Sequence, residues 1–574
     1  MSKSELKSEA APDRELIDPA HDSHLISGLS RRGFFKRVGA TGLAAAAIPL
    51  TAALKASAAT ADGTPEQIHL TWGDDPHSTV VVSWASAAQA INARVSYGTS
   101  TTERDRTVHA VQRTYTDGLN GETVFTYHAR LHGLAPGATF HYSVTADNDS
   151  NADQPFSASF QTAPRGRAAF RWTSYGDLAT PNTLWVLSSP QSRFAVEAVE
   201  QFNPLFHLLN GDLCYANLNP AAQPAVWRDF GNNNQTSAAN RPWMPCLGNH
   251  EVEFNNGIQG FRSYLTRYAL PDNGTEFPGR WYSFRVGSAL FISLDADDVI
   301  FQDGAAFVGG PSPLTPAAST GNAPIEPGTS FYIRGYSAGA QTRWLEQTLR
   351  DAADDDDVDW IIVQMHQDAL SSSKTGNGSD KGIREAWLPL FDRYGVDLVL
   401  CGHDHDYERS WPVRGCNHDT GQDVATGAVV DTLQPKPVVT GDPADGAFDS
   451  SRGTIHLILG GGGTSAPLDV YGVDTANGKP QAKVFTKANR PVAGATAGTF
   501  VRPAADALED AIWSARRDTT GTGYGIAVFD LDPGQAGGKT TITVKYYHAP
   551  GADKTPTATY ELFETIVLAK HRRD

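Results

Sequence analysis

Short runs of alternating apolar and polar residues, separated by turn residues, fill the stretch from 65 to 162. The runs cover 79–84, 94–97, 126–131, 139–145 and 156–161, and Leu134-Ala135-Pro136-Gly137 is typical of the turns between them. Alternation with a period of two places every second side chain on one face of a strand. The pattern predicts an antiparallel β-sandwich with Trp84 as a core residue.

From residue 166 onward the period changes. Apolar residues recur at helical spacing in 192–202, 340–353 and 383–394, as with Trp344, Leu345 and Leu349. Apolar runs without that spacing alternate with these helices and read as buried strands; they cover 170–174, 205–209, 243–247, 360–365, 396–401, 454–459, 524–531 and 541–547. This alternation predicts an α/β domain.

Metal-binding residue types follow five of these runs. In chain order they are Asp177; Asp212 and Tyr215; Asn249; His366; and His403 and His405. Each motif alone is weak, since Gly-Asp is a common turn and a lone histidine is more often a hydrogen-bonded core or surface residue. Polar residues just past strand ends are where open α/β sheets place ligands, and this mixture of ligands suits iron, zinc or manganese. Together the five motifs predict a two-metal phosphoesterase site.

The constellation resembles the purple acid phosphatases, within the calcineurin-like metallophosphoesterases. Many metallophosphoesterases have histidine two residues past the first aspartate, where this chain has Ala179, and tyrosine three past the second is the mark of the family, as Tyr215 is here. The resemblance implies a four-layer α/β/β/α sandwich preceded by a fibronectin-III-like domain. Phe140 stands where such a domain often carries a corner tyrosine, and the loop 367–376 lacks the histidines of the plant members.

The resemblance also implies roles for the residues. Asp177, Asp212, Tyr215 and His405 would hold the first metal, Fe(III), while Asn249, His366 and His403, with Asp212 bridging, would hold Fe(II), Zn or Mn. His250 would contact phosphate or protonate the leaving group; the alternative is a structural histidine. Asp404 and Asp406 could orient the imidazoles, whereas Tyr407, Glu408 and Arg409 would support the histidine loop.

The activity implied is an acid phosphatase that hydrolyses phosphomonoesters by attack of metal-bound hydroxide. Two alternatives stay open: a phosphodiesterase or phospholipase on the same metals, and a non-catalytic module that binds a surface through the β-sandwich. The formal charge of −17 argues against nucleic-acid or anionic-membrane partners. Small phosphate esters are the expected substrates, and the sequence leaves the oligomeric state open.

The first residues indicate export. Arg31 and Arg32 precede Gly33-Phe34-Phe35-Lys36, an apolar run from 38 to 54, and Ala56-Ser57-Ala58. This pattern is typical of a twin-arginine signal, so the translocase that reads it is an expected partner. A basic patch before an alanine-rich helix or anchor is the alternative. The predicted domains are 1–58, a polar N-terminus with the signal; 59–165, the fibronectin-III-like domain; and 166–574, the catalytic domain of a secreted or envelope-associated enzyme.

Glycine-rich and cysteine-bearing segments add little chemistry. Gly460 to Gly463 follow a predicted strand, but no Lys-Ser/Thr follows them, so close backbone packing near the site is favoured over phosphate binding. The stretches 421–451 and 476–510 are expected to be surface insertions. The four cysteines, Cys214, Cys246, Cys401 and Cys416, are too few for a disulfide framework in 574 residues. Small buried side chains are expected at the first three; a disulfide pair in an oxidising compartment is the alternative, and the sequence does not choose its partners.

Overall fold

The structure is a computed structural model, and it describes residues 62–253, 256–257, 259–302, 334–416, 421–422, 429–430, 436–440, 447–464, 471–473, 478–486, 490–491, 500–501, 506–520 and 523–573. The predicted signal at 1–58, the side chain of Cys416 and much of the two predicted insertions lie outside these residues. No helix within the described ranges is long and apolar enough to span a membrane.

Two four-stranded antiparallel sheets form the N-terminal part. In the first, the strand order is β1 (Glu66–Trp72), β2 (Val80–Ser86), β6 (Thr123–Leu131) and β5 (Val111–Thr116). In the second, it is β4 (Arg106–His109), β3 (Arg94–Gly98), β7 (Thr139–Thr145) and β8 (Phe156–Gln161). Trp84 is 1% exposed and stacks on Tyr127 with ring centroids 5.6 Å apart. The predicted β-sandwich is confirmed; the domain boundary at 165 stays a prediction.

Two seven-stranded sheets follow. The first has the order β11 (Trp243–Pro245), β10 (Phe206–Leu209), β9 (Phe170–Tyr175), β30 (Gly525–Asp532), β31 (Lys539–His548), β32 (Glu561–His571) and β22 (Phe448–Asp449). The second has the order β12 (Tyr282–Val286), β13 (Ala289–Ser293), β14 (Trp360–Gln364), β16 (Leu398–Cys401), β23 (Ile455–Leu459), β17 (Tyr407–Ser410) and β29 (Ser514–Arg517). Aromatic side chains pack the two sheets together: Trp172 of the first meets Phe291 of the second edge-on at 5.3 Å.

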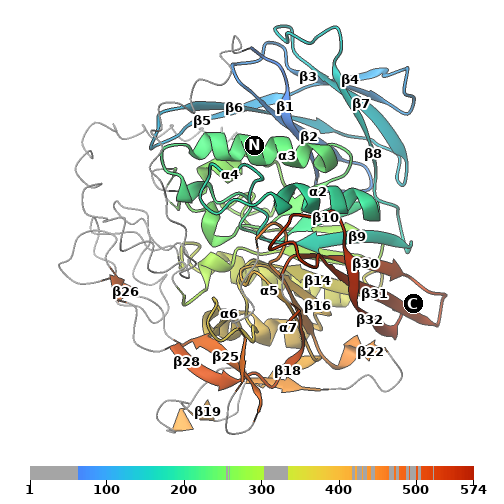
Figure 1. Ribbon diagram of the computed structural model, residues 1–574. Coiled ribbons are helices and arrows are strands. Elements are labelled where there is room, and N and C mark those ends of the chain that lie inside the picture. Colours follow the sequence, from blue (N-terminus) through green and yellow to red (C-terminus); the bar gives the residue numbers. More distant parts are fainter. Residues whose placement is uncertain are drawn as a thin grey trace, which may run out of the picture. The chain divides into compact units, whose positions relative to one another are not determined.

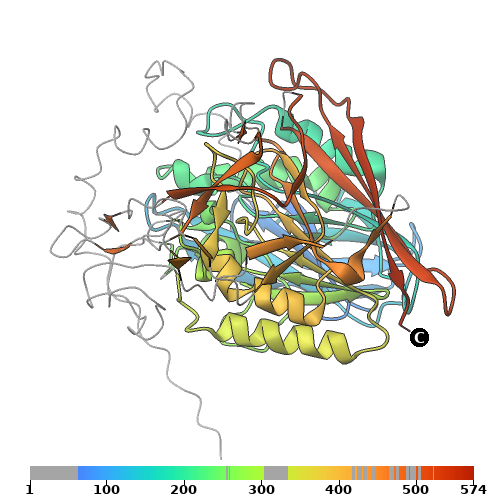
Figure 2. The same ribbon diagram turned by 90° about the horizontal axis from the view of Figure 1, so that it is seen from below.

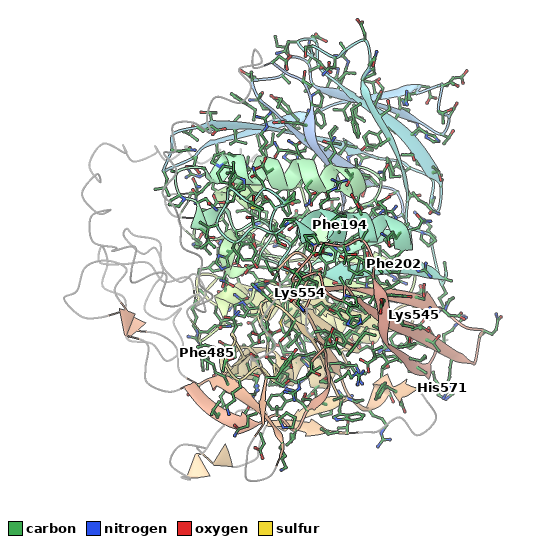
Figure 3. The ribbon with its side chains drawn as sticks, in the orientation of Figure 1. Phe194, Phe202, Phe485, Lys545, Lys554 and His571 are labelled. Atoms are coloured by element: carbon green, nitrogen blue, oxygen red, sulfur yellow. The ribbon has the colours of Figure 1, made fainter. Side chains whose placement is uncertain are left out.

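Helices cover both outer faces. Figure 1 shows α2 (Gln191–Phe202) and α3 (Gln223–Ala238) between the β-sandwich and the first sheet. The helices α5 (Ala340–Asp354), α6 (Lys381–Ala386) and α7 (Leu388–Tyr394) lie on the second sheet, as the yellow ribbons of Figure 2 show. Phe202, labelled in Figure 3, lies at the end of α2. Its ring packs on Tyr547 of β31 with ring centroids 4.6 Å apart. This layer order confirms the predicted α/β/β/α fold.

The helix predicted over 383–394 is wrong in one respect, because the structure has two helices there. The helix α6 ends at Ala386 and α7 begins at Leu388, with Pro389 in its first turn. Pro389 has no N–H to donate to a carbonyl of the preceding turn, so it cannot continue α6, and proline is well tolerated in the first turn of the helix that follows. The last strand, β32, was not predicted; its apolar residues stand next to one another, as in Leu562-Phe563 and Ile566 to Ala569, and do not alternate with polar ones.

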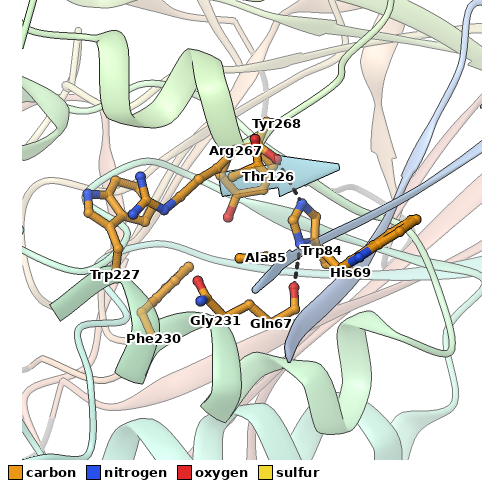
Figure 4. A pocket seen from close by; sticks show the side chains of 10 residues that line it. All are labelled: Gln67, His69, Trp84, Ala85, Thr126, Trp227, Phe230, Gly231, Arg267 and Tyr268. Carbon is orange, nitrogen blue, oxygen red and sulfur yellow. Dashed lines mark hydrogen bonds between the residues drawn. The ribbon is translucent and has the colours of Figure 1, made fainter. Parts of the chain in front are cut away.

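The β-sandwich packs directly on the α/β part. Thr71 Oγ1 donates to the Ala269 carbonyl at 2.7 Å, and Tyr142 donates its hydroxyl to the Ala239 carbonyl at 2.7 Å. Figure 4 shows the small cavity at this boundary, where His69 of β1 lies between two carbonyl oxygens. Its Nδ1 is 2.9 Å from the Gln67 oxygen and its Nε2 is 3.2 Å from the Arg267 oxygen. The two parts therefore share polar contacts as well as apolar surface.

Candidate metal centre

Parallel strands bring the predicted ligands to one edge. The strands β9, β10 and β11 run parallel in the first sheet, and β13, β14, β16 and β23 run parallel in the second. Their carboxyl ends therefore point the same way within each sheet, and each predicted ligand lies in a segment just past one of these ends. Segments far apart in sequence meet there.

Asp177, Tyr215 and His405 form one group. The Tyr215 hydroxyl lies 3.0 Å from Asp177 Oδ1 and 3.1 Å from His405 Nε2. His405 Nε2 also lies 3.2 Å from Asp177 Oδ1. A carboxylate, a phenol and an imidazole thus converge on one point, and they are three of the four residues expected at the first metal.

Asp212, His366 and His403 form a second group, whose ligand atoms lie within 4.8 Å of one another. His366 Nε2 is 3.1 Å from Asp212 Oδ2 and 3.3 Å from His403 Nδ1. Asn249 is buried at the start of a one-turn 3₁₀ helix, η5 (Asn249–Glu251). A Cβ on the preceding Gly248 would collide with Asp212, so this segment lies against the second group.

The protonation of His366 tests whether a metal fits. Its Nδ1 lies 2.7 Å from the Asn210 carbonyl oxygen, so Nδ1 carries a hydrogen and donates it. Once Nε2 has lost its proton, as a metal-bound histidine must, its lone pair faces Asp212 Oδ2, which is also an acceptor. A carbonyl that fixes the tautomer in this way is a frequent partner of a metal-bound histidine. A cation between these atoms satisfies all of them, so the residues fit a metal.

Charges in the site are strongly coupled. Burial works to raise the pKa of Asp212, but the facing His366 and His250 lower it below its ordinary value. Burial also opposes the positive charge on His366, yet Asp212 and Asp177 raise the pKa of His366 to about 10. Burial and the two aspartates raise the pKa of Tyr215 well above its ordinary value. Metal binding must therefore displace protons from His366 and Tyr215.

The backbone is strained at four of the predicted ligands. Asp177, Asp212, Tyr215 and His403 have φ angles of 59°, 50°, 59° and 66°. Non-glycine residues rarely adopt this left-handed region, and such strain persists where surrounding contacts over-determine it, often at functional sites. Glycines let the segments approach closely: a Cβ on Gly402 would lie 2.5 Å from Asp177 Oδ2. A Cβ on Gly461 or Gly463 would overlap a carbonyl oxygen, which confirms the predicted close packing of 460–463.

His250 lies beside Asp212 on the more exposed side of the site. Its backbone N–H donates to Asp212 Oδ1 at 2.8 Å, and its Nε2 is 3.9 Å from Asp212 Oδ2. The side chains of His250 and His405 are 21% and 22% exposed, whereas those of Asp177 and His366 are fully buried. A substrate would therefore meet His250 and His405 first. The catalytic role of His250 stays a prediction.

Two supporting residues were missed from the sequence. His250 Nδ1 lies 2.9 Å from Asn217 Oδ1, so Asn217 orients the ring. Glu251 is fully buried and accepts hydrogen bonds from the backbone N–H groups of Asp212, Leu213 and Gly248 at 2.8 to 2.9 Å. Glu251 directly follows Asn249 and His250 in the sequence, and this position is the signal that could have found it; Asn217 gave none.

The remaining expected residues are placed as follows. Asp406 is buried, and Asp404 is buried against the loop that follows His366. Tyr407 and Arg409 both bond to Glu564 of β32, and Glu408 accepts from Ser372, which agrees with a supporting role. Cys214, Cys246 and Cys401 are buried and free, as expected of small packing side chains.

Comparisons with known proteins identify the family. Residues 65–163 match the model described as "Purple acid Phosphatase, N-terminal domain", and residues 188–407 match "Calcineurin-like phosphoesterase". An uncharacterized protein of Mycobacterium tuberculosis is 40% identical over 518 residues, covering 88% of this chain and 87% of the relative. A phosphoenolpyruvate phosphatase of Allium cepa is 27% identical over 358 residues, covering 61% and 63%.

A solved structure agrees with this family at the level of the fold. The purple acid phosphatase from yellow lupin (Lupinus luteus) seeds superposes with a TM-score of 0.57 at 17% identity, covering 88% of this chain and 74% of that one. The fold and the site define a metallophosphoesterase with an N-terminal all-β domain. The chain belongs to the purple acid phosphatases, and its relatives imply a two-metal site. The cluster of Asp212, His366 and His403 can hold one metal ion of such a site.

Proposed function

We propose that this protein is an exported acid phosphatase that hydrolyses phosphomonoesters at a binuclear metal site. The carrying observation is the convergence of two ligand groups, Asp177–Tyr215–His405 and Asp212–His366–His403, at one edge of the two sheets. Bound cations would supply an acidified water and neutralise charge on the phosphate. Fe(III) is proposed for the first group, because a phenolate is a hard anionic ligand, and Fe(II), Zn or Mn for the second.

The chain's own residues complete the chemistry. His250 is oriented by Asn217 at Nδ1, which directs Nε2 toward the exposed side of Asp212. There it can contact the phosphate or deliver a proton to the leaving oxygen. Asp212 belongs to the second group, and its charge also helps to raise the pKa of Tyr215 in the first group, so it would suit a carboxylate shared by the two metals. The acidic chain favours small phosphate esters over nucleic acid, and the similarity to an enzyme named phosphoenolpyruvate phosphatase supports a monoester substrate.

The test combines metal analysis with two assays. The purified chain should carry two metal ions, cleave an aryl phosphomonoester, and cleave the matched aryl phosphodiester much more slowly. Faster cleavage of the diester would instead establish a phosphodiesterase on the same metals. Two bound metals with neither activity would leave a binding module and refute the proposed function.

A further inference from the structure

The loop between β14 and α6 folds back onto the turn that carries His403 and His405. Its ends are fixed, since the Asp380 N–H donates to the Asp368 carbonyl at 2.8 Å. Inside the loop, Ser373 Oγ accepts from the Gly376 N–H at 3.0 Å. From outside the loop, the Lys483 N–H donates to the Ser373 carbonyl at 2.8 Å. This is the loop that lacks the histidines of the plant members, so it needs another account of what it does.

The carboxylate of Asp404 receives three donors from this loop. The Asn377 N–H donates to Oδ1 at 2.8 Å, while the Ser371 hydroxyl and the Gly378 N–H donate to Oδ2 at 2.6 and 2.9 Å. Asp404 is 3% exposed. Hydrogen bonds to an ionised carboxylate are roughly twice as strong as neutral ones, and burial strengthens them further. Asp404 therefore ties the loop to the histidine turn.

The same loop also forms a hydrogen bond with the backbone of His403. Asn377 Nδ2 donates to the His403 carbonyl at 2.6 Å, and the His403 N–H donates to Asp177 Oδ2 at 2.9 Å. The peptide groups on both sides of His403 are thus fixed, at a residue whose φ of 66° is costly for a non-glycine side chain. The turn would otherwise relax toward an ordinary backbone conformation and carry both imidazoles with it.

Glycine allows the approach. A Cβ on Gly376 would lie 2.7 Å from Asp404 Oδ1 and 2.5 Å from Ser373 Oγ, so a larger residue would push the loop off the carboxylate. A Cβ on Gly460 would overlap the Asp404 carbonyl, so the turn is enclosed from a second side. The shapes of the loop and the turn are therefore matched.

We propose that Asp404 is a positioning residue that, through the loop 371–378, fixes the orientation of His403 and His405 for metal binding. The inference rests on the proposed function, because it takes both histidines as ligands. Asp404 touches neither substrate nor metal in this account. Its removal should weaken metal binding directly and reduce turnover only as a consequence.

The experiment measures metal retention. Asp404→Asn keeps the size but turns an NH₂ toward backbone or hydroxyl donors, and it should speed the loss of metal to a chelator by about 10- to 100-fold. Gly376→Ala should have the same effect without altering any carboxylate. Lys374→Ala, in the same loop and not bonded to Asp404, is the matched control and should retain metal like the wild type.

The outcomes separate positioning from simple support. If Asp404→Asn and Gly376→Ala lower the melting temperature but lose metal at the wild-type rate, the proposal is wrong. Should Asp404→Asn fail to fold, Gly376→Ala decides alone by the same criterion. A wild type that retains two metals but cleaves no monoester would refute the proposed function only, and metal retention by the variants would still decide the role of Asp404.

Discussion

At the scale of single residues, the site depends on which ring nitrogen of each histidine carries the hydrogen. Asn210 fixes the hydrogen of His366 on Nδ1, and Asn217 Oδ1 does the same for His250. The opposite nitrogen of each ring then faces Asp212. One carboxylate is therefore approached by two imidazoles with defined roles, one suited to a metal and one to a substrate.

Tyr215 provides a spectroscopic test. If its phenolate binds Fe(III), Tyr215→Phe should abolish the visible phenolate-to-iron absorption, because only the hydroxyl is removed. The buried ring would remain in place and keep the fold. Absorption spectra of the two iron-loaded proteins check this. A colourless wild type with zinc at both positions would reject ferric iron and leave the two-metal mechanism standing.

His250 should matter most for poor leaving groups. General acid catalysis contributes about 10²–10⁴-fold, so His250→Ala should reduce turnover of alkyl monoesters by that order and of activated aryl esters far less. Asn217→Ala should show the same selectivity in weaker form, because it releases Nδ1. Rates on paired alkyl and aryl substrates test both. Equal losses on the two substrates would mean that His250 binds phosphate or supports the metals.

The ligand types could be predicted from the sequence because each follows an apolar run that forms a buried strand. The supporting residues were predictable only in part. Asp404 was expected to orient the imidazoles, whereas Glu251 was missed. The partners of both are backbone N–H groups of segments far away in sequence, and these contacts exist only once the strands are in register. The positive φ of His403 and Tyr215 left no trace in residue type either, since neither is glycine or asparagine.

At the scale of elements, the β-sandwich and the catalytic part meet at β6 and the end of α4 (Arg262–Arg267). His128 of β6 has Nδ1 2.8 Å from Ser83 Oγ and Nε2 3.0 Å from the Thr266 carbonyl oxygen. A neutral ring satisfies both contacts, with Nε2–H donating and Nδ1 accepting. Burial, with Arg113 adding positive charge, lowers the pKa of His128 to about 3.

This contact predicts a pH dependence of stability. Between pH 6.5 and about 3, His128 binds a proton in the unfolded chain but stays neutral in the folded chain. The contribution of His128 to the free energy of unfolding is therefore fully present above pH 6.5 and is lost as the pH falls toward 3. His128→Gln should lower stability at neutral pH but flatten the acid decline. Denaturant midpoints of both proteins between these pH values give the comparison. Parallel plots of stability against pH for the two proteins would contradict this role of His128. Buried Glu253, whose pKa is raised to about 7, contributes equally to both proteins, so the comparison removes its effect.

Elements were predictable to the extent that pattern alone defines them. The β-sandwich and the alternating part follow from periodicity, whereas the break between α6 and α7 depends on one proline and β32 on pairing with β31. Strand order was not predictable. The strands β30 to β32 are the last along the chain, yet β30 lies next to β9, the first strand of the same sheet in sequence. Such pairing is decided by tertiary packing.

At the scale of the whole molecule, export stays a prediction. Replacing Arg31 and Arg32 together by lysine keeps the charge but removes the pair that the translocase reads, so uncleaved precursor should accumulate in the cytoplasm. Immunoblots of cell fractions check this. Normal export of the variant would contradict the twin-arginine assignment. The unchanged protein, expressed in parallel, serves as the control for general secretion.

The central claim is a two-metal site that performs the hydrolysis, and metal counting with turnover tests it most directly. The wild type should carry two metal ions per chain, and His366→Ala or His403→Ala should lower this toward one, because each removes a proposed ligand of the second metal. Phosphomonoester turnover should fall with the lost metal and fail to recover at moderate added metal. Unchanged metal content in both variants, or full turnover with a single metal, would contradict the account.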